Sequence, residues 1–216
     1  MRATDATTGV LEVATVHGPA RVHLHPADNP TGALVLGHGA AGGVGSPDLA
    51  AVTDAARSLG FTVALVEQPY RVAGRRSPPP APKLDRAWTD VIEDLRETGL
   101  QGLPLVVGGR SAGARVACRT AAATGAIGAL CLAFPLQPPR RAGTTPAPSR
   151  LSELDQVAVP VLVVQGDRDP FGIPPAGRRR RVVTVRGDHS LRTDLQAVAA
   201  AARAWLSRLP AAGARD

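Results

Sequence analysis

Six short runs of Val, Leu and other apolar residues recur along the chain, separated by segments with helical periodicity. Continuous apolar runs are typical of strands that are covered on both faces, as in parallel sheets. Their alternation with helices predicts an α/β fold, in which a mostly parallel sheet carries helices on both faces. The expected strands are Ala33–Gly37, Phe61–Glu67, Pro104–Gly108, Ala129–Phe134, Val159–Gln165 and Arg181–Arg186.

The first strands and the last helix have the most regular patterns. Val10–His17 and Ala20–His25 alternate around Gly18-Pro19, which predicts an antiparallel hairpin at the N-terminus. In Ser190–Leu209, apolar residues recur every three or four positions and form one stripe of a helix. The other expected helices are Asp48–Leu59, Leu84–Thr98, Ala112–Thr124 and Leu151–Gln156.

The length of 216 residues suits a single domain spanning 1–216, and 44% hydrophobic residues suffice for a core. Residues 1–10 lack the basic and apolar stretches of a signal peptide, and no apolar run approaches the roughly 18 residues of a membrane span. We therefore expect a soluble cytoplasmic protein with no membrane partner. Cys118 and Cys131 are expected to be buried thiols, because disulfides are rare in a reducing cytosol. Nothing in the sequence indicates the oligomeric state.

The net charge of +7 comes almost entirely from arginine, since Lys83 is the chain's one lysine among 25 basic residues. This bias, together with abundant Ala, Gly and Pro, is typical of a GC-rich genome. The alternative is a partner with negative charge, either nucleic acid or an anionic substrate. Nucleic acid is disfavoured, because aromatic residues do not interleave with the basic ones and no known binding motif is present. The run Arg178–Arg181 is interpreted as a solvated face, with an anion site as the alternative.

A strand, a tight turn and a helix are expected over Leu103–Arg115, LPLVVGGRSAGAR. The turn contains G-x-S-x-G, with Ser111 between Gly109 and Gly113. In this context the flanking positions must be small, and the serine adopts a strained backbone conformation. Its hydroxyl is then exposed at a helix N-terminus, where backbone N–H groups favour developing negative charge. Ser111 is the candidate nucleophile; the alternative is a Gly-rich turn with an incidental serine.

A serine hydroxyl needs a neighbouring base, because it is a weak nucleophile near neutral pH. His17, His23 and His25 lie in the predicted hairpin, and His38 follows an early strand. His189 follows the last strand and is expected to open the final helix. The base comes last in chain order in enzymes with this strand–turn–helix serine, which makes His189 the candidate.

The acid is expected on the loop after the strand Val159–Gln165, which contains two aspartates. Asp169 is favoured, because the chain has left the strand there and Pro170 forces a turn. Asp167 is expected to pair with a neighbour or cap the loop, and Asp188 is a third candidate. The acid would hold the imidazole tautomer and stabilise the imidazolium ion.

Acyl transfer also needs hydrogen-bond donors for the oxyanion. The candidates are the backbone N–H groups of Ala112 and of Ala40, which lies in the Gly-rich segment 37–43. His38 and Gly39 are expected to shape this segment and to contact the substrate. A Gly-rich turn also suits a phosphate, but neither G-x-x-x-x-G-K-[ST] nor G-x-G-x-x-G is present. The prediction includes no metal ion and no cofactor.

Two loops follow strands at their carboxyl ends, where open α/β sheets bind ligands. They are Tyr70–Lys83 and Gln137–Ser149, and neither is long enough for a substantial lid. Arg71, Arg75 and Arg76 of the first loop are candidates for binding a carboxylate or phosphate. Their use would make the partner a small anionic acyl substrate.

These motifs together resemble the α/β-hydrolase fold, and more narrowly the KANL3/Tex30-type α/β-hydrolase-like domain family near the dienelactone-hydrolase-like proteins. The resemblance covers roughly residues 30–210 and rests on four segments. It implies Ser111 as nucleophile, Asp169 as acid and His189 as base, on a core without a large cap domain. It implies no particular substrate. The four segments are Gly37–Ala40, Gly108–Arg115 (GGRSAGAR), Gln165–Gly172 (QGDRDPFG) and Asp188–Leu191 (DHSL).

The leading hypothesis is a serine hydrolase that cleaves a small ester, thioester or amide through an acyl-enzyme on Ser111. The alternative is a binding or scaffold protein that keeps the fold without turnover, since fold does not determine function. A third hypothesis, nucleic-acid association through the positive charge, predicts steeply salt-dependent DNA binding. An open pocket beside hydrogen-bonded Ser111 and His189 would favour the enzyme, and a filled pocket would favour the scaffold.

Overall fold

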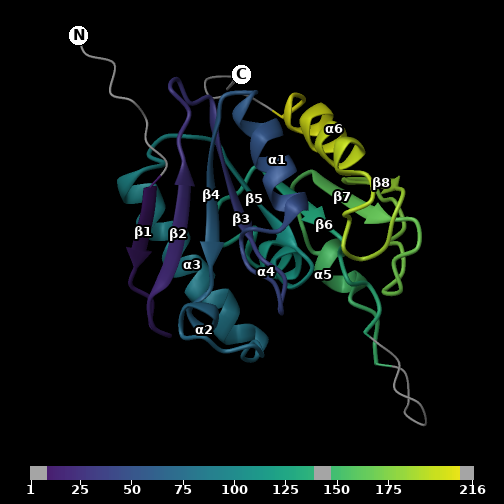
Figure 1. Cartoon of the computed structure of the whole chain (residues 1–216), viewed down its shortest axis with the longest axis horizontal. Coiled ribbons are helices and arrows are strands. Elements are labelled where there is room, and N and C mark those ends of the chain that lie inside the picture. The colour runs from purple at the N-terminus through teal and green to yellow at the C-terminus, as the bar shows by residue number, and fades with distance from the viewer. Residues whose placement is uncertain (1–8, 139–146, 210–216) are drawn as a thin grey trace.

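The computed structural model describes residues 9–138 and 147–209 (Figure 1). Eight strands of this part of the chain form one sheet in the order β1-β2-β4-β3-β5-β6-β7-β8. β2 pairs antiparallel with both β1 and β4, and all other neighbours are parallel. The strands are β1 (Gly9–Val13), β2 (Ala20–His25), β3 (Gly32–Gly37), β4 (Phe61–Glu67), β5 (Leu105–Arg110), β6 (Gly128–Leu132), β7 (Val161–Gly166) and β8 (Arg180–Val185).

Helices cover both faces of this sheet. On one face, α1 (Pro47–Arg57) and α6 (Leu195–Leu206) lie side by side (Figure 1). The other face carries α3 (Ala81–Thr98), α4 (Ala112–Thr120) and α5 (Leu151–Asp155), and the short α2 (Pro69–Val72) follows β4. The result is a three-layer arrangement with two hydrophobic cores, one on each side of the sheet.

The side chains of β3 show why a parallel strand can be apolar throughout. Ala33 and Val35 point into the core under α3 and α4, whereas Leu34 and Leu36 point into the core under α1 and α6. Successive residues of a strand face opposite sides of the sheet, so a strand with two covered faces needs no polar position. The continuous apolar runs in the sequence therefore predicted these central strands correctly.

The two cysteines lie in the core beneath α4. Cys118 and Cys131 are both buried free thiols, as expected, and their Sγ atoms are 3.4 Å apart. The hydrogen bond with Cys118, together with burial, raises the pKa of the Cys131 thiol. Both cysteines therefore pack as small apolar side chains.

The final helix begins five residues later than its apolar stripe predicted, at Leu195 instead of Ser190. Leu191 is fully buried but has a φ of 53°, which no α-helix accommodates. The Asp194 carboxylate then caps the helix by accepting a hydrogen bond from the Ala197 N–H at 2.9 Å. His189 consequently lies in a loop and does not open the helix.

The predicted loop Tyr70–Lys83 is shorter than expected, because α2 forms at one end of it and α3 begins at Ala81. Both helices have a proline in the first turn, where its missing N–H costs no intrahelical bond. The first strand is also shorter than predicted and ends at Val13. Residues 139–146, most of the predicted loop Gln137–Ser149, lie outside the described residues.

The arginine run Arg178–Arg181, which includes the first two residues of β8, is not uniformly solvated. Arg178, Arg179 and Arg181 are exposed, whereas Arg180 is buried and forms an ion pair with Asp155 at 2.9 Å. Arg180 also donates a hydrogen bond to the Pro175 carbonyl. One member of the run therefore joins β8 to α5 within the fold.

The topology is that of an α/β-hydrolase fold: a mostly parallel eight-stranded sheet with an antiparallel pair at one edge. No separate cap domain is formed by residues 9–138 and 147–209. No helix in these ranges is both long enough and apolar enough to span a membrane. The carboxyl ends of β3, β5, β7 and β8 meet at one edge of the sheet, and the segments that follow them form the candidate site.

Candidate active site

Ser111 occupies the sharp turn between β5 and α4, with φ and ψ of 52° and −105°. This is a sparsely populated conformation for a residue with a side chain, so the turn stores strain. The Ser111 N–H donates to the Leu132 carbonyl at 2.9 Å, and the Gly113 N–H donates to the His38 carbonyl at 3.1 Å. These bonds to two neighbouring segments hold the strained turn in place.

The two glycines around Ser111 are required by close backbone contact with β3. A Cβ on Gly113 would lie 2.4 Å from the Gly37 carbonyl oxygen, and one on Gly109 would lie 2.5 Å from the same atom. These clashes are with backbone atoms, because Gly37 lies in β3, Gly109 in β5 and Gly113 in α4, so no side-chain movement could relieve them. The small residues predicted at these two positions are therefore required by packing against β3 as well as by the turn itself.

Three side chains are joined by hydrogen bonds at the carboxyl edge of the sheet. The Ser111 Oγ lies 3.0 Å from His189 Nε2, and His189 Nδ1 lies 2.8 Å from Asp169 Oδ2. The Asp169 carboxylate is fully buried, whereas the His189 ring is partly exposed. The structure thus brings together the nucleophile, acid and base candidates, which are 58 and 20 residues apart in the chain.

The Asp169 carboxylate is held by two further donors. Its Oδ1 accepts from the Phe171 N–H at 2.9 Å, and its Oδ2 also accepts from Gln165 Nε2 at 2.7 Å. The Phe171 ring packs on the His189 ring, with centroids 4.3 Å apart. A carboxylate held by several donors is fixed in direction, which suits it to orient an imidazole.

The two competing aspartates have other partners. Asp167 Oδ1 accepts a hydrogen bond from the Gly187 N–H at 2.8 Å, so Asp167 ties the β7 loop to the β8 loop. Asp188 is exposed and accepts from the Ser190 N–H, closing a local turn. A second hydrogen bond, from the Ser190 hydroxyl, is the main reason why the pKa of Asp188 is lowered. Neither carboxylate contacts the His189 ring.

Two residues that position the site, Arg110 and Gln165, were not predicted from the sequence. Arg110, the variable position before Ser111, donates from Nη2 to the His189 carbonyl oxygen at 2.9 Å and pairs through Nε with buried Asp48 at 3.0 Å. Gln165, the last residue but one of β7, is fully buried and reaches Asp169. The polar Gln165 inside an apolar run was the one available hint, because buried polar groups need a partner.

Both oxyanion candidates, Ala40 and Ala112, border the same cavity as Ser111. Among the described residues, the N–H groups of Ala40 and Ala112 have no hydrogen-bond acceptor. The Ala40 carbonyl accepts from the Tyr70 hydroxyl at 2.9 Å, and burial raises the pKa of Tyr70 to about 12. Tyr70 therefore holds the Ala40–Ala41 peptide, which directly follows the peptide that carries the Ala40 N–H.

His38 holds this loop in place and does not face the cavity. Its Nδ1 lies 2.8 Å from the Gly39 carbonyl oxygen, and its Nε2 accepts from the Gln68 N–H at 3.1 Å. A backbone N–H can only donate, so Nε2 carries no proton and the proton resides on Nδ1. Burial lowers the pKa of His38, which keeps it neutral. Gly39 lies against Ser111, where a Cβ would be 3.7 Å from the serine Cβ.

A cavity of about 330 Å³ opens beside Ser111. Ala40, Ser111 and Ala112 border it, and its walls are mostly apolar. Three arginines also line it: Arg115, Arg119 and Arg150. The cationic groups near the serine thus come from α4 and from the residue before α5.

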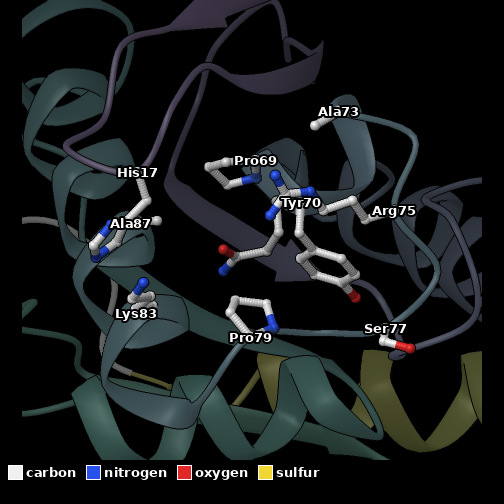
Figure 2. Close-up of a pocket in the computed structure, with 10 residues that line it drawn as sticks. His17, Pro69, Tyr70, Ala73, Arg75, Ser77, Pro79, Lys83 and Ala87 are labelled. Atoms are coloured by element: carbon white, nitrogen blue, oxygen red, sulfur yellow. The ribbon is translucent and has the colours of Figure 1, made fainter.

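The arginines expected to bind the substrate are not among the residues that line this cavity. Arg75 lines a second cavity of about 230 Å³ together with His17 and Lys83 (Figure 2). Arg71 donates to the Arg75 carbonyl at 3.3 Å, and Arg76 is exposed. The structure places Arg75 in a neighbouring hollow, and Pro79 borders both cavities.

The fold is that of an α/β hydrolase, and its site has a serine at a strand–helix turn that is hydrogen-bonded to a histidine. The histidine in turn is hydrogen-bonded to a buried aspartate, and both residues lie on loops that follow later strands. The family model described as "Alpha/beta hydrolase domain" matches residues 30–205. The chain therefore belongs to the α/β-hydrolase domain family.

Several solved structures share this fold. XC6422 from Xanthomonas campestris, described as an α/β serine hydrolase without lid, has a TM-score of 0.76 and 19% identity over 97% of this chain and 99% of that one. Est1E from Butyrivibrio proteoclasticus has a TM-score of 0.76 and 14% identity over 93% and 98%. Dienelactone hydrolase from Anabaena variabilis has a TM-score of 0.73 and 18% identity over 94% and 98%. No curated protein sequence matches the chain.

Proposed function

We propose that the chain is a serine hydrolase that cleaves a small ester, thioester or amide through an acyl-enzyme on Ser111. The observation that carries this proposal is the unbroken series of hydrogen bonds from Ser111 Oγ through the His189 ring to Asp169. Nucleophile and base within hydrogen-bond reach, with the base oriented by a third group, is the arrangement that nucleophilic catalysis needs.

In the acylation step, the Ser111 Oγ attacks the substrate carbonyl carbon while His189 Nε2 accepts the hydroxyl proton. The imidazolium that forms is stabilised by the Asp169 carboxylate at Nδ1, and Asp169 itself stays ionised. The negative charge develops on the carbonyl oxygen, where the Ala40 and Ala112 N–H groups would donate to it. Collapse of this intermediate breaks the bond to the leaving group, which takes the proton from His189 Nε2.

In the deacylation step, water takes the place of the leaving group. His189 Nε2 accepts a proton from the water as its oxygen attacks the acyl carbon, and the same proton then returns to Ser111 Oγ. The products are a carboxylic acid and regenerated serine. Removal of one preorganised oxyanion donor typically costs about 2.7–4 kcal/mol of transition-state stabilisation.

The size of the cavity supports a small substrate. Its volume of about 330 Å³ is at the lower end of the range for small-molecule sites, about 300–1,000 Å³. One of the structurally similar proteins, Est1E, is described with ferulic acid bound, and another is a dienelactone hydrolase. An open cavity beside Ser111 also favours turnover over a scaffold role. The narrower KANL3/Tex30-type assignment and a cytoplasmic location are part of this proposal.

A fluorophosphonate probe tests the proposal directly, because it reacts with an activated serine. Wild-type protein should be labelled, and Ser111→Ala should not. Hydrolysis of a panel of p-nitrophenyl esters and thioesters should likewise be lost in Ser111→Ala. Folded wild-type protein that neither reacts with the probe nor hydrolyses any member of the panel would exclude this function.

A further inference from the structure

The charges around the Ser111 cavity do not balance. Arg119 donates to Asp85 through two bonds of 2.8 and 2.6 Å and to Glu153 at 3.2 Å. Arg115 donates to the same Glu153 through two bonds of 2.8 and 2.6 Å. Two arginines are thus neutralised by two carboxylates in a partly buried network.

These two carboxylates are fully committed to the network. Burial raises the pKa of Glu153, but hydrogen bonds from Arg115 and the charges of both arginines outweigh it and lower the pKa overall. For Arg119, burial lowers the pKa, and the bond to Asp85 outweighs that effect and raises it. Glu153 and Arg119 therefore stay charged, and among the described residues the two carboxylates bond to Arg115 and Arg119 and not to a third arginine.

Arg150 is that third arginine. Its Nη1 donates to the neutral Pro135 carbonyl at 2.9 Å, and no carboxylate of residues 9–138 or 147–209 lies within 4.0 Å of its guanidinium. Burial and the nearby charge of Arg115 lower the pKa of Arg150, so its surroundings disfavour the cation. One net positive charge remains beside Ser111, and a guanidinium has further donors to offer an anion.

Arg150 lies close enough to Arg115 for the charge of Arg115 to lower its pKa, and Arg115 lies on α4 beyond the reacting serine. Arg115 is four residues beyond Ser111, which corresponds to about 6 Å along the helix axis. The same cavity is also lined by apolar side chains: Pro78, Ala81, Leu84, Pro135 and Phe171. A ligand that fits has an ester group at one end, a short apolar chain and an anion at the other end.

We propose that the Ser111 cavity selects small esters or thioesters that carry a carboxylate several bonds from the scissile carbonyl, and that Arg150 binds this carboxylate. This inference rests on the proposed hydrolase function and adds its substrate class. The carboxylate neutralises the one unpaired guanidinium and binds in the bidentate geometry that arginine favours. Because Arg115 and Arg119 are already paired with Glu153 and Asp85, Arg150 is the arginine of this cavity that remains for an added negative charge.

Matched ester pairs test this selection, with the carboxylate replaced by a methyl group in the neutral partner. Monoethyl glutarate is compared with ethyl pentanoate, and 4-acetoxybutanoate with butyl acetate, so that the two pairs place the carboxylate in the acyl or the alcohol part. In wild type, kcat/KM should be at least about tenfold higher for the anionic member of one pair, the size expected for one charge-assisted hydrogen bond. The preference should decrease with added salt.

Two Arg150 variants and one control identify the residue responsible. Arg150→Gln should reduce the preference to within about twofold of unity, and Arg150→Lys should keep part of it because the charge remains. Arg57→Gln removes an exposed positive charge on α1, on the opposite face of the sheet, and should leave the preference as in wild type. Circular dichroism checks that the variants are folded.

Fluorophosphonate labelling separates failure of this inference from failure of the hydrolase function. Free pentanoate should slow labelling of Ser111 in wild type more than its uncharged amide, pentanamide, does, and this difference should disappear in Arg150→Gln. Labelled wild type with no preference in either pair and no difference in protection would overturn the carboxylate site while the hydrolase function stands. Wild type that is not labelled would overturn both.

Discussion

The guanidinium of Arg110 donates a hydrogen bond of 2.9 Å to the backbone carbonyl of His189. This bond links Arg110, the residue before the nucleophile, to the loop that carries His189. His189 lies 78 residues after Ser111 in the chain. Arg110 also pairs with Asp48, a fully buried carboxylate at the start of α1. The Arg110 side chain thereby connects the turn that carries Ser111, the loop that carries His189 and helix α1.

Substitution of Arg110 by Gln should separate stability from catalysis. Arg110→Gln leaves Asp48 buried without its cation, which typically costs about 3–5 kcal/mol of folding free energy. It also releases the His189 loop, so kcat should fall about 10-fold or more with KM little changed. Thermal denaturation and steady-state kinetics measure the two effects.

The double variant Asp48→Asn with Arg110→Gln provides the control. It removes the buried charge together with its partner, so most of the lost stability should return while kcat stays low. Recovery of kcat along with stability would show that Arg110 acts only through folding and does not position His189.

The two aspartates of the β7 loop should differ sharply in their effect on activity. Asp169→Asn keeps the side-chain volume but permits the wrong imidazole tautomer, so kcat should fall by roughly 10³–10⁴. Asp167→Asn keeps an oxygen acceptor for the Gly187 N–H and removes only an exposed charge 3.8 Å from Arg168, so folding stability should change by about 1 kcal/mol or less. Kinetics on one ester for both variants makes the comparison. Similar losses in the two would contradict the assignment of Asp169 as the acid.

The glycine at position 113 should tolerate no side chain. A Cβ there would lie 2.4 Å from the Gly37 carbonyl oxygen, so Gly113→Ala must displace α4 or β3. We expect a loss of about 1–3 kcal/mol of stability and a large loss of Ser111 labelling. Gly45→Ala is the matched control, because its Cβ would meet nothing within 4 Å and its effect should stay within about 0.5 kcal/mol. Normal labelling in Gly113→Ala would argue against a tight turn at Ser111 that excludes a side chain at position 113.

Because His38 is buried in its neutral form, the folded protein should be less stable in mild acid than near neutral pH. Burial lowers the folded-state pKa of His38 below its ordinary value of 6.5, so the unfolded chain binds a proton at a higher pH than the folded chain does. The free energy of unfolding should therefore decrease as the pH falls below about 6.5 and level off below the folded-state pKa. Urea denaturation at about pH 5 and about pH 7.5 measures this difference.

The appropriate control for this pH effect is His25, because burial lowers its pKa as well. The comparison is therefore made in a His25→Gln background, with and without His38→Gln. The glutamine retains an acceptor for the Gln68 N–H but does not titrate between these pH values, so the pH dependence should be smaller in the double variant. An unchanged pH dependence would mean that other groups produce it.

The order of strands and helices and the three triad candidates followed from local patterns. Apolar runs, helical spacing and the glycines around Ser111 are set by backbone geometry within about a dozen residues. His189 and Asp169 were found because each follows a strand in the required order. The start of α6 was placed wrongly for the opposite reason: Leu191 continues the apolar stripe, but it is buried from a loop with φ of 53°.

The sequence by itself determined the α/β fold class, the serine at a strained turn and the candidates for base and acid. Only the tertiary structure decided which arginines lie beside Ser111, which residues orient His189 and where the buried charges find partners. Those contacts join positions far apart in the chain, such as Arg110 with Asp48 and Arg115 with Glu153. They depend on how helices pack against the sheet, and 24 arginines spread along the chain carry no local pattern that distinguishes one from another.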